Sequence, residues 1–91
     1  MTYYLLKPCE GHAGYLSTLK KNEKVDLQSL VSELESQGYK VTDVKHLLIA
    51  KKDVEVTIYP NGKLLVKEDN EAEAVRAVEE IYSVILPEME Q

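Results

Sequence analysis

The segment PCEGH, residues 8–12, holds the two side chains whose chemistry is easiest to name, the thiol of Cys9 and the imidazole of His12. At this spacing they could bind a metal or act as a nucleophile and its base. A zinc site needs three or four such ligands, and the other candidate in the sequence is His46. A catalytic pair needs an oxyanion pocket, which no neighbouring pattern indicates. We therefore expect a turn here, with no metal site, no cofactor and no catalytic residue.

Acidic residues are abundant between positions 68 and 80, where paired carboxylates could in principle carry acid–base chemistry. They fall on a segment with helical spacing, so we expect a solvated helix face. The four glycines are scattered at positions 11, 14, 38 and 62, and no glycine-rich phosphate loop is present. These patterns favour a protein that is not an enzyme.

The length of 91 residues predicts a single domain, 1–91, because chains this short seldom bury two cores. A single cysteine cannot form an intramolecular disulfide, which is typical of proteins from a reducing compartment. No run is long enough to span a bilayer, and residues 1–12 lack the pattern of a signal peptide. We expect a cytoplasmic protein that does not contact a membrane.

The net charge of −5 is distributed unevenly. Residues 1–67 hold ten lysines against eight acidic residues, whereas residues 68–91 hold Arg76 against eight acidic residues. A surface built from the first two thirds of the chain could therefore be neutral or slightly basic. Overall acidity lowers the expectation of nucleic-acid binding but does not exclude it.

Two segments have the periodicity of amphipathic helices. The first follows Asp26, a suitable N-cap, and ends at Gly38, a residue that readily closes a helix. The second follows Asn70, which can cap it while Glu73 reaches back in a capping box, and stops before Pro87.

Between the helices the sequence predicts three strands, at residues 41–50, 53–59 and 63–67, with Pro60-Asn61-Gly62 as a hairpin turn. Residues 15–21 and 2–7 are further strand candidates. The predicted fold is an α+β two-layer sandwich, a mainly antiparallel sheet of four to five strands with two helices on one face.

The residues from LSTL (16–19) through VDLQSLV (25–31) to TIYPNGKLLVKEDNEAEAVRAVEEIYSVI (57–85) resemble one half-repeat of the TATA-box-binding protein (TBP) fold. The most specific element is the hairpin from Ile58 to Lys63, followed by a strand and an acid-capped helix. The resemblance spans residues 15–86 and leaves residues 1–14 as an N-terminal segment with room for an extra strand.

In the TBP family two tandem halves press their concave sheets into the minor groove and insert phenylalanine wedges. This chain matches one half and has no phenylalanine, and Tyr59 stands at one wedge position with Val44 near the other. The resemblance therefore implies a saddle that is completed by a second copy.

In the 53–67 ribbon, Val54, Val56 and Ile58 alternate with polar residues, so one side should pack on the helices and the other should stay open. The residues expected on the open side are His46, Leu48, Glu55, Thr57, Tyr59, Lys63, Leu65 and Lys67. An exposed patch with two leucines is typical of a protein contact, so we expect a protein partner, a second copy of the chain.

Two alternatives stay open at this point. The same face could bind nucleic acid, with Lys63 and Lys67 on phosphates and Tyr59 stacking on a base, although Glu55 would weaken that attraction. The N-terminal strand or loop could instead cover the face and leave no contact surface.

Overall fold

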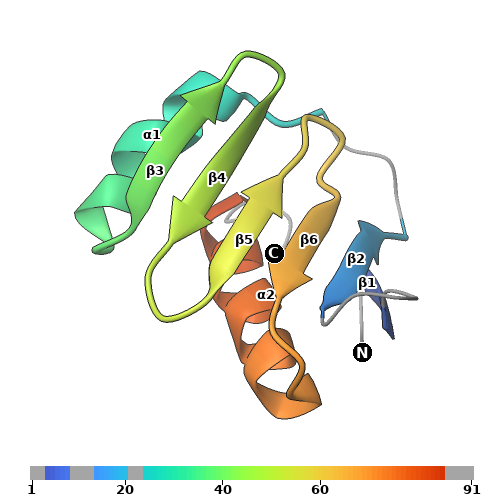
Figure 1. Ribbon diagram of the computed structural model, residues 1–91. Coiled ribbons are helices and arrows are strands. Elements are labelled where there is room, and N and C mark those ends of the chain that lie inside the picture. Colours follow the sequence, from blue (N-terminus) through green and yellow to red (C-terminus); the bar gives the residue numbers. More distant parts are fainter. Residues whose placement is uncertain (1–3, 9–13, 21–23, 86–91) are drawn as a thin grey trace.

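The computed structural model describes residues 4–8, 14–20 and 24–85 of the chain. One antiparallel sheet carries both helices on the same side (Figure 1). The elements in chain order are β1 (Tyr4–Pro8), β2 (Tyr15–Leu19), α1 (Leu27–Ser36), β3 (Lys40–Val44), β4 (Leu47–Lys51), β5 (Glu55–Ile58), β6 (Leu64–Lys67) and α2 (Glu71–Ile85). The predicted α+β two-layer class is confirmed, with six strands in place of four to five.

The first helix has both of its predicted ends. The Asp26 carboxylate accepts hydrogen bonds from the backbone N–H groups of Gln28 and Ser29, at 3.2 and 3.4 Å, which satisfies two amides of the first turn. At the other end Gly38 has a φ of +95°, and the Tyr39 N–H donates to the Leu34 carbonyl at 3.0 Å. This pattern closes the helix in the way that a C-terminal glycine favours.

The second helix begins as predicted at Asn70, whose side-chain oxygen accepts from the Glu73 N–H at 3.1 Å. The reciprocal half of the predicted capping box is different. The Asn70 N–H donates to the Glu68 carboxylate at 3.1 Å, so Glu68 takes the place expected of Glu73. The buried side of the helix consists of Ala74, Val78, Ile81 and Tyr82.

The strand order across the sheet is β1-β2-β6-β5-β4-β3, and every neighbouring pair is antiparallel. The chain crosses from β2 to the opposite edge through α1 and then returns strand by strand until β6 pairs with β2. The β5–β6 hairpin closes where the Tyr59 N–H donates to the Lys63 carbonyl at 2.9 Å, and Gly62 takes a φ of +89°.

The prediction of one strand at 41–50 is wrong, because the chain turns back at Lys45 and His46. Lys45 takes a φ of 58°, a left-handed conformation that lysine seldom adopts. With neither glycine nor proline at the turn, the usual sequence signal for a hairpin is absent. The ten residues therefore form two paired strands, β3 and β4.

The core lies between the helices and one face of the sheet. Its fully buried side chains include Leu34 from α1, Ile81 and Tyr82 from α2, and Leu48, Val56, Ile58, Leu64 and Val66 from the sheet. Among the described residues, neither helix is both long and apolar enough to cross a membrane.

Candidate functional site

The face of the sheet opposite the helices is the candidate site. Side chains of paired residues lie on the same face, so the strand register assigns every strand residue to one side. Leu64, Val66, Val56 and Ile58 face the helices, and their chain neighbours face the other way. The open face is formed by Leu5, Lys7, Leu16, Thr18, Lys40, Thr42, Val44, Leu47, Ile49, Lys51, Glu55, Thr57, Tyr59, Lys63, Leu65 and Lys67.

The centre of the open face is aliphatic. One cross-strand row runs through Leu16, Leu65, Thr57 and Ile49, each the register partner of the next. Thr57 is only 8% exposed although no helix covers it, which places it under its larger neighbours. The three aliphatic side chains of this row are half-buried.

A second apolar row lies two residues further along each strand on the same face, toward the end of the sheet that holds the β5–β6 turn. It contains Tyr59 and Leu47, both half-buried, with Leu5 and Val44 at the two edges, and Thr18 and Lys63 interrupt it between Leu5 and Tyr59. Leu5 is 50% exposed and Val44 is 44% exposed, the two large apolar side chains that the described residues leave most open. The two rows together form an apolar band that reaches from β1 to β3.

The charges on this face are almost all positive. Within residues 4–8, 14–20 and 24–85, register places five lysines there, Lys7, Lys40, Lys51, Lys63 and Lys67, against one acidic residue, Glu55. The Glu55 carboxylate is already 3.1 Å from the Lys67 ammonium. On the other side of the molecule the helices carry six glutamates and one arginine. The sheet face is therefore basic although the whole chain carries a net charge of −5.

Six of the eight residues predicted for the open side lie on it: Glu55, Thr57, Tyr59, Lys63, Leu65 and Lys67. Leu48 does not, because it is 0% exposed and faces the helices. The turn at Lys45–His46 reverses the alternation, so that Val44 pairs with Leu47 on one face and Leu48 falls on the other. Leu47 and Ile49 take the place that was expected of Leu48.

His46 is also not where the sequence analysis placed it. It lies in the turn between β3 and β4, exposed, and not in a strand beside the other residues. The described residues contain no cluster of three side chains suited to hold a metal ion. Cys9 and His12, the pair considered for metal or nucleophile chemistry, lie outside the described residues.

The open face also has members that sequence reasoning missed: Leu5, Lys7 and Leu16 from the first two strands, and Lys40 and Lys51 from β3 and β4. The first two strands show too little alternation to assign sides, since residues 2–7 are mostly apolar or aromatic. Lys51 was missed because the β3–β4 turn reverses which alternate residues face the helices, and Lys40 was missed because the predicted strand began one residue later, at position 41.

The described part of the N-terminal segment extends the sheet. β1 pairs with β2 at the sheet edge, and Tyr4 faces the helix layer, where its hydroxyl donates to the Glu79 carboxylate at 3.0 Å. The Tyr4 and Tyr82 rings lie 5.6 Å apart between their centres. Residues 4–8 therefore add a sixth strand and two side chains, Leu5 and Lys7, to the open face.

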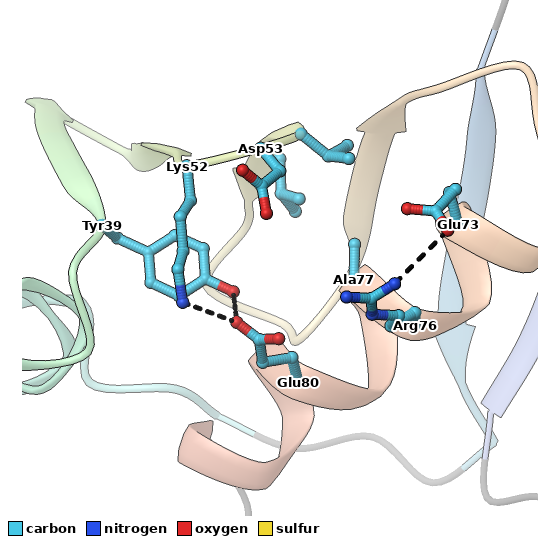
Figure 2. Close-up of a pocket in the computed structure, with 9 residues that line it drawn as sticks. Tyr39, Lys52, Asp53, Glu73, Arg76, Ala77 and Glu80 are labelled. Carbon is cyan, nitrogen blue, oxygen red and sulfur yellow. Dashed lines mark hydrogen bonds and ion pairs between the residues drawn. The ribbon is translucent and has the colours of Figure 1, made fainter.

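A polar notch lies on the other side of the molecule, between α2 and the β4–β5 turn (Figure 2). Its volume is about 40 Å³, room for a few water molecules and far below the several hundred Å³ of a ligand pocket. The Lys52 ammonium is 3.4 Å from the Glu80 carboxylate, and the Arg76 guanidinium is 3.4 Å from Glu73. These paired charges fit a structural contact better than a ligand site.

The notch is held by a three-residue cluster of Tyr39, Lys52 and Glu80. The Tyr39 hydroxyl donates to the Glu80 carboxylate at 2.5 Å, and the Lys52 ammonium lies 5.1 Å from the centre of the Tyr39 ring. The hydrogen bond from Tyr39 lowers the pKa of Glu80, and Lys52 lowers it further. Burial of the phenol, together with the hydrogen bond to Glu80, raises the pKa of Tyr39. The cluster connects α2 to the start of β3.

We expect this cluster to make stability depend on pH at both ends of the range. A lowered Glu80 pKa stabilises the fold above the ordinary glutamate pKa, and this contribution disappears as the pH falls through the lowered value. A raised Tyr39 pKa stabilises the fold below the ordinary tyrosine pKa of about 10, and this contribution disappears as the pH rises toward the raised value. At neutral pH, Tyr39→Phe should lower the free energy of unfolding by about 1 kcal/mol.

Urea unfolding at a series of pH values measures this dependence. The difference in the free energy of unfolding between wild type and Tyr39→Phe should become smaller at acid pH. Glu80→Gln should make the free energy of unfolding less dependent on pH in the acid range. A Tyr39→Phe effect of the same size at every pH would contradict the role given to the ionised Glu80.

No family model matches this chain, and comparisons with curated proteins and with solved structures find no match.

Proposed function

We propose that this chain is a non-catalytic interaction module and that its open face binds a protein. The observation that carries the proposal is the apolar band across all six strands, which no described element of the chain covers. Aliphatic side chains gathered on one surface of a small protein are typical of a contact site, because water contact with them is unfavourable. The order of elements from β2 to α2 supports the proposed resemblance to a TBP half-repeat.

A second copy is the simplest partner. The two longer Cα extents of the whole molecule are 31 and 28 Å, so an interface of the standard roughly 800 Å² per partner would take up most of the open face. Two such faces would bring their aliphatic centres together. The lysines around the band would also meet, so we propose that pairing between copies is weak and that salt strengthens it by screening the repulsion.

Binding of nucleic acid is the second candidate, and the five lysines of the open face favour it. They would neutralise more phosphates than the two predicted from the sequence, so affinity would fall more steeply with salt. Against it, Tyr59 is the one aromatic side chain that the described residues place on the face, which offers a single base-stacking position among them.

Sedimentation over a range of protein concentrations tests the pairing of copies. The wild type should associate more as the salt concentration rises, and Leu65→Glu, which puts a charge in the centre of the apolar band, should abolish the association. Ala72→Glu adds the same charge on an exposed position of α2 and should leave it unchanged. A strict monomer at every concentration and salt would remove the second copy as a partner.

A further inference from the structure

The charge of the open face decides which kind of protein binds it best. Resting on the proposed function, we infer that the preferred partner is a different protein, one whose contact surface has an aliphatic centre and acidic residues around it. The second copy is then the weaker occupant of the same face.

The positions of the lysines carry this inference. Lys7 lies on the edge strand β1, in the row of Leu16 and Leu65. One row at one end of the strands consists of Lys67, Glu55, Lys51 and Lys40 in that order, and Lys63 lies near the other end beside Tyr59. Positive charges therefore border the apolar band at one end of the strands and at the β1 edge, and Lys63 adds a further charge within the band.

This border is largely free to pair with a partner. Lys7, Lys40, Lys51 and Lys67 are exposed, and Lys63 is half-buried. Glu55, the one acidic residue that the described strands place on the face, is already paired with Lys67. A partner with carboxylates around its contact surface could form ion pairs with these lysines. A second copy would place lysines against lysines. Complementary charges of this kind select partners and raise association rates.

The aliphatic centre favours a protein over a nucleic acid. A nucleic acid would place phosphates on the lysines but would leave Leu16, Ile49 and Leu65 against sugars or base edges, with little apolar surface to bury. A protein surface buries these side chains and meets the lysines with carboxylates. Apolar burial and ion pairing then both favour binding. Protein interfaces commonly have this arrangement, an apolar core with a polar or charged rim.

The chain itself can supply a partner of the required chemistry. The face variant Lys7→Glu/Lys51→Glu/Lys63→Glu keeps the apolar band and changes the face from five lysines and one acidic residue to two lysines and four. The control variant Lys24→Glu/Lys52→Glu/Arg76→Glu changes the total charge equally at positions outside the open face. Circular dichroism and urea midpoints establish that each variant folds.

Association is measured between fluorescently labelled wild type and each unlabelled protein, at about 50 and 500 mM salt. We expect the wild type to bind the face variant at least tenfold more tightly than it binds itself at low salt, and to lose that preference at high salt. The control variant should bind no better than the wild type does. The neutral variant Lys7→Gln/Lys51→Gln/Lys63→Gln should pair with itself more tightly than the wild type does, a result that does not require the acidic variant to fold.

The other outcomes separate the two proposals. If the wild type pairs with itself as tightly as with the face variant, the acidic partner is wrong and the proposed contact face stands. If no mixture of folded proteins associates, the contact face itself is wrong. If a single-stranded or duplex oligonucleotide displaces the face variant from the wild type in the low-salt buffer, nucleic acid is the preferred ligand and the inference is overturned.

Discussion

Leu64→Ala should lower the free energy of unfolding by about 2 to 5 kcal/mol, whereas Leu65→Ala, one residue along the chain, should lower it by about 1 kcal/mol or less. Leu64 is 0% exposed and pairs with Ile58 and Ser17 beneath the helices, so its removal leaves a cavity in the core. Leu65 is half-buried on the open face, where water can fill the space that the leucine leaves.

Urea unfolding measures both losses, and the dependence of the free energy of unfolding on urea concentration should be the same in both variants. The comparison is well matched because the two substitutions remove the same atoms from neighbouring positions of β6. Equal losses would mean that both faces of the sheet are covered, which would contradict the assignment of an open face.

The second large effect is expected at Tyr82, which is 1% exposed. Its hydroxyl donates to the Gly62 carbonyl at 2.9 Å and lies 3.0 Å from the Ser17 hydroxyl. Since the Tyr82 proton goes to Gly62, the Ser17 hydroxyl donates to Tyr82. Tyr82→Phe leaves both of these buried groups without that partner, so we expect a loss of about 1 to 3 kcal/mol.

A double-mutant cycle with Ser17→Ala shows whether this hydrogen bond causes the loss. In the Ser17→Ala background, Tyr82→Phe should lower the free energy of unfolding by less than it does in the wild type. The Ser17 hydroxyl, one of the two groups that lose the Tyr82 hydroxyl as a partner, is already absent there. Additive losses would mean that the two hydroxyls do not interact. The network matters for the site, since it fixes the β5–β6 turn and strand β2 on α2.

Local signals were enough to predict both helices and the β5–β6 hairpin. A cap is decided by one or two side chains close in sequence, so Asp26, Gly38 and Asn70 mark helix ends without knowledge of the rest of the fold. The hairpin turn at Pro60-Asn61-Gly62 is equally local. The alternation around Val56 and Ile58 likewise places Tyr59 and Leu65 on the side away from the helices.

The β3–β4 turn was missed because its residues carry no local signal. Lys45 and His46 are unusual turn residues, and pairing between β3 and β4 holds them in place. A missed two-residue turn reverses which alternate residues face the helices. Every residue after the turn in the predicted 41–50 strand is therefore assigned to the wrong face. Leu48 was therefore placed on the open face in place of Leu47 and Ile49.

The basic character of the open face could not be seen in the sequence for a related reason. Lys7, Lys40 and Lys51 are spread over three strands and come together only when the register is known. Summing charges along the chain gives an acidic protein, because its 16 aspartates and glutamates outnumber its 11 lysines and arginines. Only the fold separates the two kinds of charge onto opposite sides.

Methyl relaxation in the presence of a soluble paramagnetic agent tests the central claim most directly, that one face of the sheet is closed by the helices and the other is open. In dilute protein, where copies do not pair, we predict strong relaxation of the Ile49 and Leu65 methyl groups and weak relaxation of those of Leu48 and Leu64. Equal protection of all four residues would show that the proposed contact face is covered by the chain itself.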